Sequence, residues 1–354
     1  MMDNKDSIVK TLENLGNFLS QFKTSGISKN ENIPFNDQFF DAFKQQIETT
    51  ETYNGWFTKD NVLFAIEQWS NLLNYSNINT WLQKYSFKKN NSKTVAIIMA
   101  GNIPFVGFHD FISVLVSGHN VLIKQSSNDK NFLPLLVRYL ETIDPSYKNT
   151  IRFTDGKLED FDAVIATGSN NTSRYFEYYF KGKPSIIRKN RNSVAVLTGN
   201  ETKEQMAALS EDIFRYYGLG CRNVSKLFVP KNYDFDKFFN AIYKWHPIIE
   251  EIKYANNYDY NKAVYLMSEF EMLENGFLML KEDSSYGSPI ATLFYEYYET
   301  VESIKQKLEQ DKEQIQCIVS DGLFSNEVKF GHTQKPELWD YADDVDTVDF
   351  LLKI

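Results

Sequence analysis

The fold is decided by an apolar stretch, Thr94-Val95-Ala96-Ile97-Ile98-Met99-Ala100, which continues into Gly101-Asn102-Ile103-Pro104. A continuous, β-prone apolar run of this kind is typical of a strand that is buried on both faces of a sheet. Similar runs recur at residues 121–123, 163–166, 185–187 and 194–197, with helical patterns between them at residues 108–116, 132–143 and 172–180. Strands and helices that alternate in this way predict an α/β fold with a doubly wound (Rossmann-like) parallel sheet.

The flanking regions have different patterns. Residues 1–90 are expected to be helical, because apolar side chains recur at helical spacing from Ile8 to Phe22 and further helices fit residues 37–47, 58–73 and 78–83. The region after residue 200 is mixed. Its expected helices are residues 203–216, 234–245, 261–270 and 301–308, and its expected strands are residues 227–229, 277–280, 290–293 and 316–319.

Composition bounds the class of protein. The chain has 354 residues, 42% of them hydrophobic, which is enough for one large domain or two. A net charge of −9 argues against general binding to nucleic acid or to anionic membranes. Two cysteines are too few for a disulfide framework, and no apolar run is long enough to be a signal peptide or a membrane span. We expect a cytoplasmic protein.

One of the two cysteines lies in a glycine-rich loop, Tyr217-Gly218-Leu219-Gly220-Cys221-Arg222-Asn223. Glycines permit unusual dihedral angles and a close approach of the backbone, and the charge of Arg222 beside the sulfur favours the thiolate, which is the nucleophilic form. The alternative is a buried structural thiol. A loop between two elements is a poor place to bury one, so Cys221 is a candidate nucleophile.

Three further loops follow predicted strands, where the ligands of a parallel sheet bind. Asn102 is either a turn residue or a side-chain amide able to donate a hydrogen bond to an oxyanion. Lys124 ends the second strand and is followed by Ser126 and Ser127, a set that suits phosphate or ribose. The alternative for Lys124 is a side chain that reaches past apolar surface to solvent.

The third of these loops is Thr167-Gly168-Ser169, which joins a predicted strand to a predicted helix. Backbone amides at such a helix start are suited to holding a phosphate, although Gly-Ser turns without ligands are common. The chain has neither a Walker loop nor a complete Gly-x-Gly-x-x-Gly fingerprint.

The order of these loops resembles the aldehyde dehydrogenase superfamily and, more narrowly, the LuxC-type acyl-CoA reductases. The closer resemblance is carried by Gly101–Pro104, Ser117-Gly118 with Val121–Lys124, the run from Ile187 to Val196, the cysteine loop, and Tyr341-Ala342-Asp343 with Val345-Asp346-Thr347. The resemblance covers residues 93–229 well and the C-terminal part loosely. It implies an aldehyde-dehydrogenase-like fold.

The resemblance also implies the roles of individual residues. Cys221 matches the nucleophile that takes the acyl group as a thioester, and Asn102 matches the asparagine that binds the oxyanion. Lys124, Ser126 and Ser127 match the positions that hold the adenosine ribose of a nicotinamide cofactor. Thr167, Gly168 and Ser169 match the turn beneath the cofactor's pyrophosphate. No metal ligand is implied.

Three departures from the superfamily narrow the reaction. The stretch Ile187–Ser193 stands where hydrolytic aldehyde dehydrogenases carry a glutamate, and it contains no carboxylate to activate water. No acidic residue follows Lys124 at Ser126 or Ser127, which favours NADPH over NADH. The segment from Ser284 to Pro289 resembles the Glu-x-Phe-Gly-Pro stretch that holds the nicotinamide ribose but lacks its Glu, and either Asp283 or Ser284 is a candidate substitute.

The sequence therefore predicts NADPH-dependent reduction of a long-chain acyl-CoA, or another acyl thioester, to the aldehyde. The alternatives are a hydrolytic NAD(P)-dependent aldehyde dehydrogenase and a cysteine-based acyltransferase without redox activity. The resemblance further implies an acyl-activating synthetase as partner and a homo-oligomer. The expected parts are a helical region (1–90), a cofactor-binding domain (91–200), a catalytic domain carrying Cys221 (201–322) and a C-terminal segment (323–354).

Overall fold

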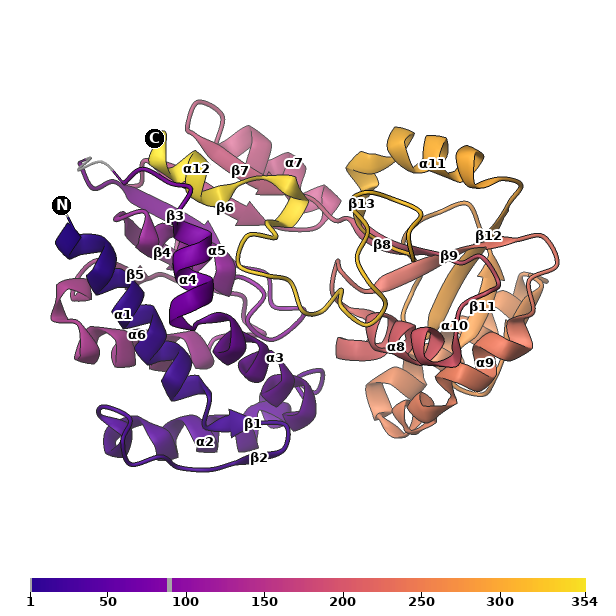
Figure 1. Ribbon diagram of the computed structural model, residues 1–354, viewed down its shortest axis with the longest axis horizontal. Coiled ribbons are helices and arrows are strands. Elements are labelled where there is room, and N and C mark those ends of the chain that lie inside the picture. Colours follow the sequence, from indigo (N-terminus) through magenta and orange to yellow (C-terminus); the bar gives the residue numbers. More distant parts are fainter. Residues whose placement is uncertain (1, 88–90) are drawn as a thin grey trace. The chain divides into compact units, whose positions relative to one another are not determined.

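The stretch that opens at Thr94 forms the central strand of a five-stranded sheet in the computed structural model, which describes residues 2–87 and 91–354. The sheet order is β5-β4-β3-β6-β7 and all neighbouring strands are parallel (Figure 1). Its strands are β3 (Thr94–Ile98), β4 (Asn120–Lys124), β5 (Ile151–Phe153), β6 (Ala163–Thr167) and β7 (Ser185–Arg188). This doubly wound order confirms the predicted fold class.

Helices join these strands and cover the sheet. They are α5 (Phe108–Val116), α6 (Phe132–Ile143), the 3-10 turn η1 (Pro145–Tyr147) and α7 (Asn170–Tyr179). Ala96 and Val164 are fully buried on one face of the sheet, where Phe176 of α7 packs on them, while Val95 and Ile97 point to the opposite face and are also buried. Both faces are therefore covered, which explains why β3 is apolar throughout.

The order of the strands reverses beside β3. The chain first moves outward through β4 and β5 and then returns to place β6 on the other side of β3. The carboxyl ends of β3 and β6 therefore border the crevice in which sheets of this type bind ligands. The loops after β3, β4 and β6 all leave from this one edge.

The N-terminal region is helical, as predicted. It consists of α1 (Met2–Leu19), α2 (Asn36–Tyr53), α3 (Lys59–Leu72), α4 (Tyr75–Leu82) and a small hairpin of β1 (Phe22–Lys23) and β2 (Gly26–Ile27). Residues 1 and 88–90, at the ends of the predicted helical region, lie outside the described residues. No helix in the described part of the chain is long and apolar enough to cross a membrane.

A second sheet has the order β10-β11-β12-β9-β8-β13, and only its β10–β11 pair is antiparallel. Its strands are β8 (Asn192–Val196), β9 (Val224–Pro230), β10 (Met272–Glu274), β11 (Met279–Glu282), β12 (Thr292–Tyr298) and β13 (Ile315–Val319). Its helices are α8 (Lys203–Phe214), η2 (Arg215–Gly218), α9 (Phe235–Ile242), η3 (Tyr243–Glu250), α10 (Ile252–Met267), α11 (Val301–Gln310) and η4 (Lys312–Gln314).

The chain divides into two compact units. The first is Met1–Lys189 together with Glu337–Ile354, and the second is Asn190–Pro336. The division falls between Lys189 and Asn190, before the boundary expected at residue 200, because β8 pairs with β9 and β13 and not with β7. The expected C-terminal segment (323–354) is likewise shared between the two units. Its residues up to Pro336 belong to the second unit, and Glu337–Ile354 belong to the first.

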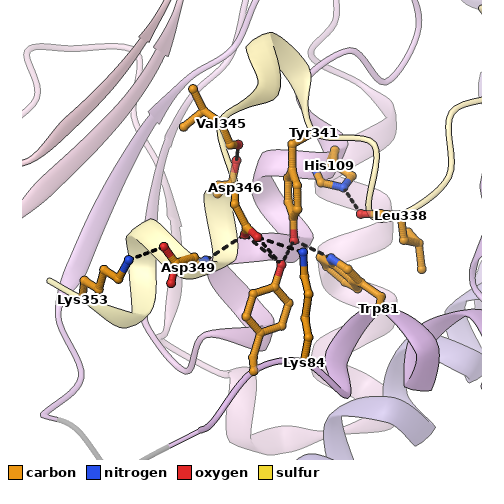
Figure 2. Close-up of polar contacts among 11 residues, drawn as sticks. Trp81, Lys84, His109, Leu338, Tyr341, Val345, Asp346, Asp349 and Lys353 are labelled. Atoms are coloured by element: carbon orange, nitrogen blue, oxygen red, sulfur yellow. Dashed lines mark hydrogen bonds and ion pairs between the residues drawn. The ribbon is translucent and has the colours of Figure 1, made fainter. Parts of the chain in front are cut away.

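These last residues, which contain η5 (Ala342–Asp344) and α12 (Thr347–Leu352), are held to the first unit by polar contacts. Tyr341 Oη accepts a hydrogen bond from Trp81 Nε1 at 2.6 Å and lies 2.5 Å from Tyr85 Oη (Figure 2). The Asp346 carboxylate accepts from Tyr85 at 2.8 Å and from Lys84 at 2.9 Å. The segment is thereby fixed against α4 and the residues that follow it.

Arg188, at the end of β7, makes the other anchor of the C-terminal segment. Its buried guanidinium forms an ion pair with Asp110 of α5 at 2.7 Å and donates to Ala342 O at 2.7 Å and to Thr347 Oγ1 at 2.9 Å. A planar, always charged guanidinium can satisfy several acceptors at once in a buried setting. The basic residue at position 188 is thus structural.

Candidate active site

Cys221 lies in the second unit, in the loop between η2 and β9. Helix α8 ends at Phe214, and the chain then adopts left-handed dihedral angles at Tyr216 (φ 55°) and Tyr217 (φ 58°). Such angles are uncommon for aromatic side chains, so the turn must be held by its surroundings. Both tyrosine side chains are buried, and Cys221 is a partly exposed thiol at the end of the turn. Cys221 thus differs from Cys317, which is buried.

The side chain of Asn223 holds this turn. Asn223 is buried, and its Nδ2 donates to the carbonyl oxygens of Asp212 at 3.1 Å and Arg215 at 2.7 Å. Its Oδ1 accepts from the N–H of Gly220 at 2.8 Å. The Asn223 amide therefore donates to carbonyls at the end of α8 that have no partner within the helix. It also fixes the backbone of Gly220, the residue before Cys221.

Two other contacts fix Cys221 and its neighbour. Ser193 of β8, the last residue of the 187–193 run, donates a hydrogen bond from its hydroxyl to the carbonyl of Cys221 at 3.0 Å. The guanidinium of Arg222 lies 3.6 Å from the sulfur of Cys317, a buried residue on β13. The Arg222 charge, which the sequence predicts beside the Cys221 sulfur, thus contacts the sulfur of Cys317.

A second buried polar side chain fixes the backbone at the start of the segment that resembles the nicotinamide-ribose stretch. Lys226 of β9 is fully buried, and its Nζ donates to the carbonyls of Asp283 and Ser284, each at 2.9 Å. Its charge is balanced by Glu296 of β12 at 2.8 Å. Burial lowers the pKa of Lys226, an effect that the contact with Glu296 opposes. The backbone at residues 283–284 is thereby fixed to the strand that follows Cys221.

Asp283 and Ser284, the two candidate substitutes for the missing Glu, are distinguished by their contacts. Although burial acts to raise it, hydrogen bonds from Lys281 and Ser285 bring the pKa of the Asp283 carboxyl down to about 2. The carboxylate of Asp283 is thus ionised and engaged by its own strand and turn. The backbone carbonyl of Ser284 accepts a hydrogen bond from Lys226.

Another loop of the second unit is tied to α8 by a buried carboxylate. Asp212 accepts hydrogen bonds from Gly331 N at 2.6 Å, Thr333 N at 2.9 Å and Thr333 Oγ1 at 2.8 Å. Burial raises the pKa of Asp212 to about 6, despite these hydrogen bonds and the neighbouring His332. His332 itself is exposed. Asp212 therefore links residues 331–333 to the helix that leads to Cys221.

In the first unit, Asn102 lies in the loop after β3 and is exposed. The glycine before it is required by packing, because a Cβ at Gly101 would lie 2.6 Å from Oγ of Ser126. Further along the same loop, Phe105 has a left-handed backbone (φ 60°) and donates its N–H to the carboxylate of Asp129 at 3.2 Å. Burial raises the pKa of Asp129 to about 6. The Asn102 loop is thus attached to the loop after β4.

The predicted cofactor residues that follow β4 lie at the carboxyl edge of the first sheet. Lys124 is half-buried and donates to Gly156 O, in the loop after β5, at 2.8 Å. Ser126 is half-buried and its Oγ accepts from Asn128 N at 3.2 Å, while Ser127 is exposed. Lys124 is therefore neither a buried unpaired cation nor a side chain turned wholly to solvent.

The predicted turn after β6 lies at the same edge. Ser169 is the N-cap of α7, and its Oγ accepts from Thr172 N at 3.3 Å. Gly168 is fixed by packing, since a Cβ there would lie 3.0 Å from Phe176 and 3.1 Å from Thr172. Thr167 is the last residue of β6 and is half-buried. The first unit thus brings together Asn102, Lys124, Ser126, Ser127 and the Thr167–Ser169 turn at one edge, while Cys221 belongs to the second unit.

Sequence reasoning missed the residues that hold these loops. Asn223, Lys226, Asp212 and Asp129 are polar side chains that are buried or desolvated and bind backbone groups of the candidate loops. A signal was present for Asn223 and Lys226, since polar residues within or beside an apolar strand need partners. In the part of the chain that the structure describes, no group of three or more His, Cys, Asp or Glu is arranged to hold a metal ion.

Solved structures with a similar fold include aldehyde dehydrogenases. Aldehyde dehydrogenase 21 from Physcomitrella patens, in complex with the reaction product succinate, has a TM-score of 0.66 at 9% identity over 100% of this chain and 89% of its own. Indole-3-acetaldehyde dehydrogenase AldA from P. syringae, in complex with NAD+ and IAA, has a TM-score of 0.60 at 11% identity over 89% and 71%. Lactaldehyde dehydrogenase from Escherichia coli has a TM-score of 0.57 at 12% identity over 84% and 70%.

At these identities the likeness establishes the fold and no more. None of the curated proteins compared with the chain matches it. The family model described as acyl-CoA reductase (LuxC) matches residues 10–244, a range that includes Asn102, Lys124, the Thr167–Ser169 turn and Cys221. It covers more than half of the 354 residues. The predicted resemblance is confirmed: the chain belongs to the acyl-CoA reductase (LuxC) family and is an oxidoreductase with an aldehyde-dehydrogenase-like fold.

Proposed function

We propose that this protein reduces a long-chain acyl-CoA, or another acyl thioester, to the aldehyde with NADPH, through an acyl group held on Cys221. The observation that carries the proposal is the family match over residues 10–244, which contains both the cysteine loop and the loops at the edge of the first sheet. The partial exposure of Cys221 supports it, because a nucleophile must reach its substrate.

In the proposed reaction, the Cys221 thiolate attacks the thioester carbonyl and a tetrahedral oxyanion forms. The oxyanion collapses, the carbon–sulfur bond to CoA breaks, and the CoA thiol leaves with a proton. Cys221 then carries the acyl group as a thioester. Hydride addition to its carbonyl carbon would give a thiohemiacetal oxyanion, which collapses to the aldehyde as the carbon–sulfur bond breaks and Cys221 returns as thiolate. Each cycle consumes one hydride and one proton, the proton being taken up from solvent by the departing CoA thiolate, and restores the enzyme thiolate.

Two donors are assigned to the oxyanion. The roles implied by the family resemblance are donation from the side-chain amide of Asn102 and from the backbone N–H of Cys221. Preorganised donors of this kind stabilise charge as it develops, and removal of one costs about a hundredfold to a thousandfold in kcat. The hydrogen bond between the Asn223 side chain and the Gly220 N–H supports the role of the Cys221 N–H, because it fixes the backbone directly before Cys221.

The fate of the acyl group follows from the residues beside Cys221. The run Ile187–Ser193, whose last residue contacts the cysteine carbonyl, has no carboxylate to act as a base toward water. Its basic members are engaged elsewhere: Arg188 pairs with Asp110, Lys189 lies 2.7 Å from Glu177, and Arg191 lies 3.6 Å from Glu313. An acyl-cysteine in this setting is expected to persist until hydride arrives.

A nicotinamide cofactor fits the residues at the carboxyl edge of the first sheet. Lys124, Ser126 and Ser127 offer one cation and two hydroxyls for the adenosine ribose and its phosphate, and α7 begins directly after the Gly168–Ser169 turn, where a pyrophosphate is favoured. A side chain at position 168 would crowd Phe176 and Thr172 of α7. The cofactor would supply the hydride. NADPH is favoured by the absence of an acidic residue directly after Lys124, and NADH is the alternative, as for AldA, whose structure holds NAD+.

The proposal assigns cofactor binding to residues 91–200 and acyl chemistry to residues 201–322. We also infer, from the composition and the family resemblance, a cytoplasmic location, a homo-oligomeric state and supply of the acyl group by an acyl-activating synthetase. The mechanism does not depend on these three inferences.

The test is NADPH oxidation by the full chain against a series of acyl-CoA thioesters, with separate quantification of aldehyde, free acid and CoA. The proposal predicts aldehyde and CoA in equal amounts, and loss of both in Cys221→Ser. Formation of acid from an aldehyde without any added thiol would favour a hydrolytic dehydrogenase. Acylation of Cys221 without binding of NADPH or NADH would favour an acyltransferase.

A further inference from the structure

We propose that Asp155 and Lys130 set the preference of the first unit between a 2′-phosphorylated and an unphosphorylated adenosine ribose. The inference rests on the proposed nicotinamide cofactor and deepens it. It concerns the turn after β5, which the sequence did not single out. Asp155 is a carboxylate on the turn that contacts Lys124, whereas the positions directly after Lys124 in the sequence carry none.

The topology brings this turn to the ribose site. Strands β4 and β5 are parallel neighbours, with Ile123 opposite Phe153, so their carboxyl ends lie at the same edge. The turn is fixed there because Thr154 N donates to Ile123 O at 2.9 Å and Gly156 N donates to Thr154 Oγ1 at 3.1 Å. Asp155 therefore stands on an anchored turn beside the end of β4.

The turn after β5 contacts two lysines of the β4 side of this edge. The ammonium of Lys124 donates to Gly156 O at 2.8 Å, and the ammonium of Lys130 lies 2.6 Å from Oδ1 of Asp155. The attraction of Lys130, with a smaller effect of Lys124, lowers the pKa of the Asp155 carboxyl, so this group is ionised at neutral pH. The loop that carries Lys130 is itself closed, since Asp129 N donates to Ser126 O at 3.2 Å.

The charges at this edge predict a competition. A 2′-phosphate brings about two negative charges, and the two ammonium groups of Lys124 and Lys130 suit it. Asp155 repels that phosphate and occupies Lys130, whereas it is suited to accept hydrogen bonds from a free 2′-hydroxyl. Asp129, the other carboxylate of the Lys130 loop, is turned to Phe105 N and does not share this role. Asp155 thus weakens the selectivity for NADPH that Lys124 and the serines favour.

The experiment is calorimetric titration of the full chain with 2′,5′-ADP and with 5′-AMP, which report the ribose site without any turnover. In Asp155→Asn, the affinity for 2′,5′-ADP should rise about fivefold, the effect of removing one exposed unit charge several ångströms from a phosphate, with little change for 5′-AMP. In Lys130→Met, the affinity for 2′,5′-ADP should fall by a similar factor. Glu159→Gln is the control, because it removes an exposed carboxylate from the same loop and changes the net charge equally.

Three outcomes would overturn the inference. An unchanged ratio of the two affinities in Asp155→Asn would show that Asp155 does not select between them. An equal shift in Glu159→Gln would show that overall charge is responsible. Failure of both nucleotides to bind the unmodified chain would overturn the cofactor site itself, and the inference with it, which distinguishes this failure from the first two.

Discussion

The side-chain amide of Asn223 donates to the carbonyl of Arg215 at 2.7 Å, across the turn whose left-handed residues lead to Cys221. This contact connects the end of α8 with the start of β9. It is the reason that a partly exposed thiol can lie on a fixed backbone. The geometry around Cys221 therefore depends on a residue that need not touch substrate.

Replacement of Asn223 by Ala should leave buried backbone groups without partners. The Arg215 carbonyl and the Gly220 N–H both lose the contact that Asn223 provides. We expect a loss of about 3 kcal/mol in the free energy of unfolding, measured in urea, and an altered rate of alkylation at Cys221. Asn256→Ala, at an exposed position on α10, is the control and should change neither. Equal stability of the two variants would contradict the role of Asn223 in holding this turn.

Replacement of Lys226 by Met should also destabilise the second unit. The change removes the donor to two carbonyls and leaves Glu296 without its closest cation. Breaking a buried pair on one side costs about 3 kcal/mol, and the further change Glu296→Gln should recover part of this. Lys231→Met removes an exposed lysine that pairs with Glu299 and should cost less than about 1 kcal/mol. Urea unfolding of the unmodified chain and of these three variants checks the order.

Removal of the Tyr341 hydroxyl tests the anchor of the C-terminal segment. In Tyr341→Phe, Trp81 Nε1 and Tyr85 Oη both lose a partner in the cluster of Figure 2, so the free energy of unfolding should fall by about 2 kcal/mol. Tyr179→Phe, which removes a hydroxyl from an exposed side chain of α7, should have no measurable effect. Equal thermal unfolding temperatures for the two variants would show that the cluster does not stabilise the fold.

The buried carboxyl of Asp212 predicts a dependence of stability on pH. Its pKa in the folded chain, about 6, lies above the value of about 4 for an unperturbed Asp, so the folded chain binds the extra proton. The contribution of this group to stability is therefore present at pH 4 and is lost as the pH rises through 6. Relative to Asp212→Asn, the unmodified chain should lose roughly 2 kcal/mol between pH 4.5 and pH 7. Parallel stability curves would refute this assignment.

Much of the fold could be predicted from local sequence. The helices expected at residues 108–116 and 132–143 coincide with α5 and α6, because their apolar periodicity and their ends are both clear. Strand β5 was missed, since only Ile151 of its three residues is buried and the run is too short to show a pattern. The return of α12 to the first unit depends on contacts such as that of Thr347 with Arg188, which join residues far apart in sequence.

The candidate site could be predicted in part. Glycine, cysteine and strand-end polar residues mark loops directly, so the sequence alone marks Cys221, Asn102 and Lys124 as candidates. The supporting residues were not found, because their partners are backbone groups of distant segments: Lys226 binds residues 283–284, and Asp212 binds residues 331–333. The Asp155 turn was missed for the same reason, since only the pairing of β4 with β5 brings it to the edge where the ribose site is predicted.

The central claim is that Cys221 holds an acyl group for hydride and not for water. The most direct measurement is the mass of the intact chain after incubation with one equivalent of a long-chain acyl-CoA, followed by NADPH. We predict one acyl adduct on Cys221, absent in Cys221→Ser, that is stable in buffer and is released as aldehyde when NADPH is added. Release of free acid before NADPH, or aldehyde formation by Cys221→Ser, would contradict the account.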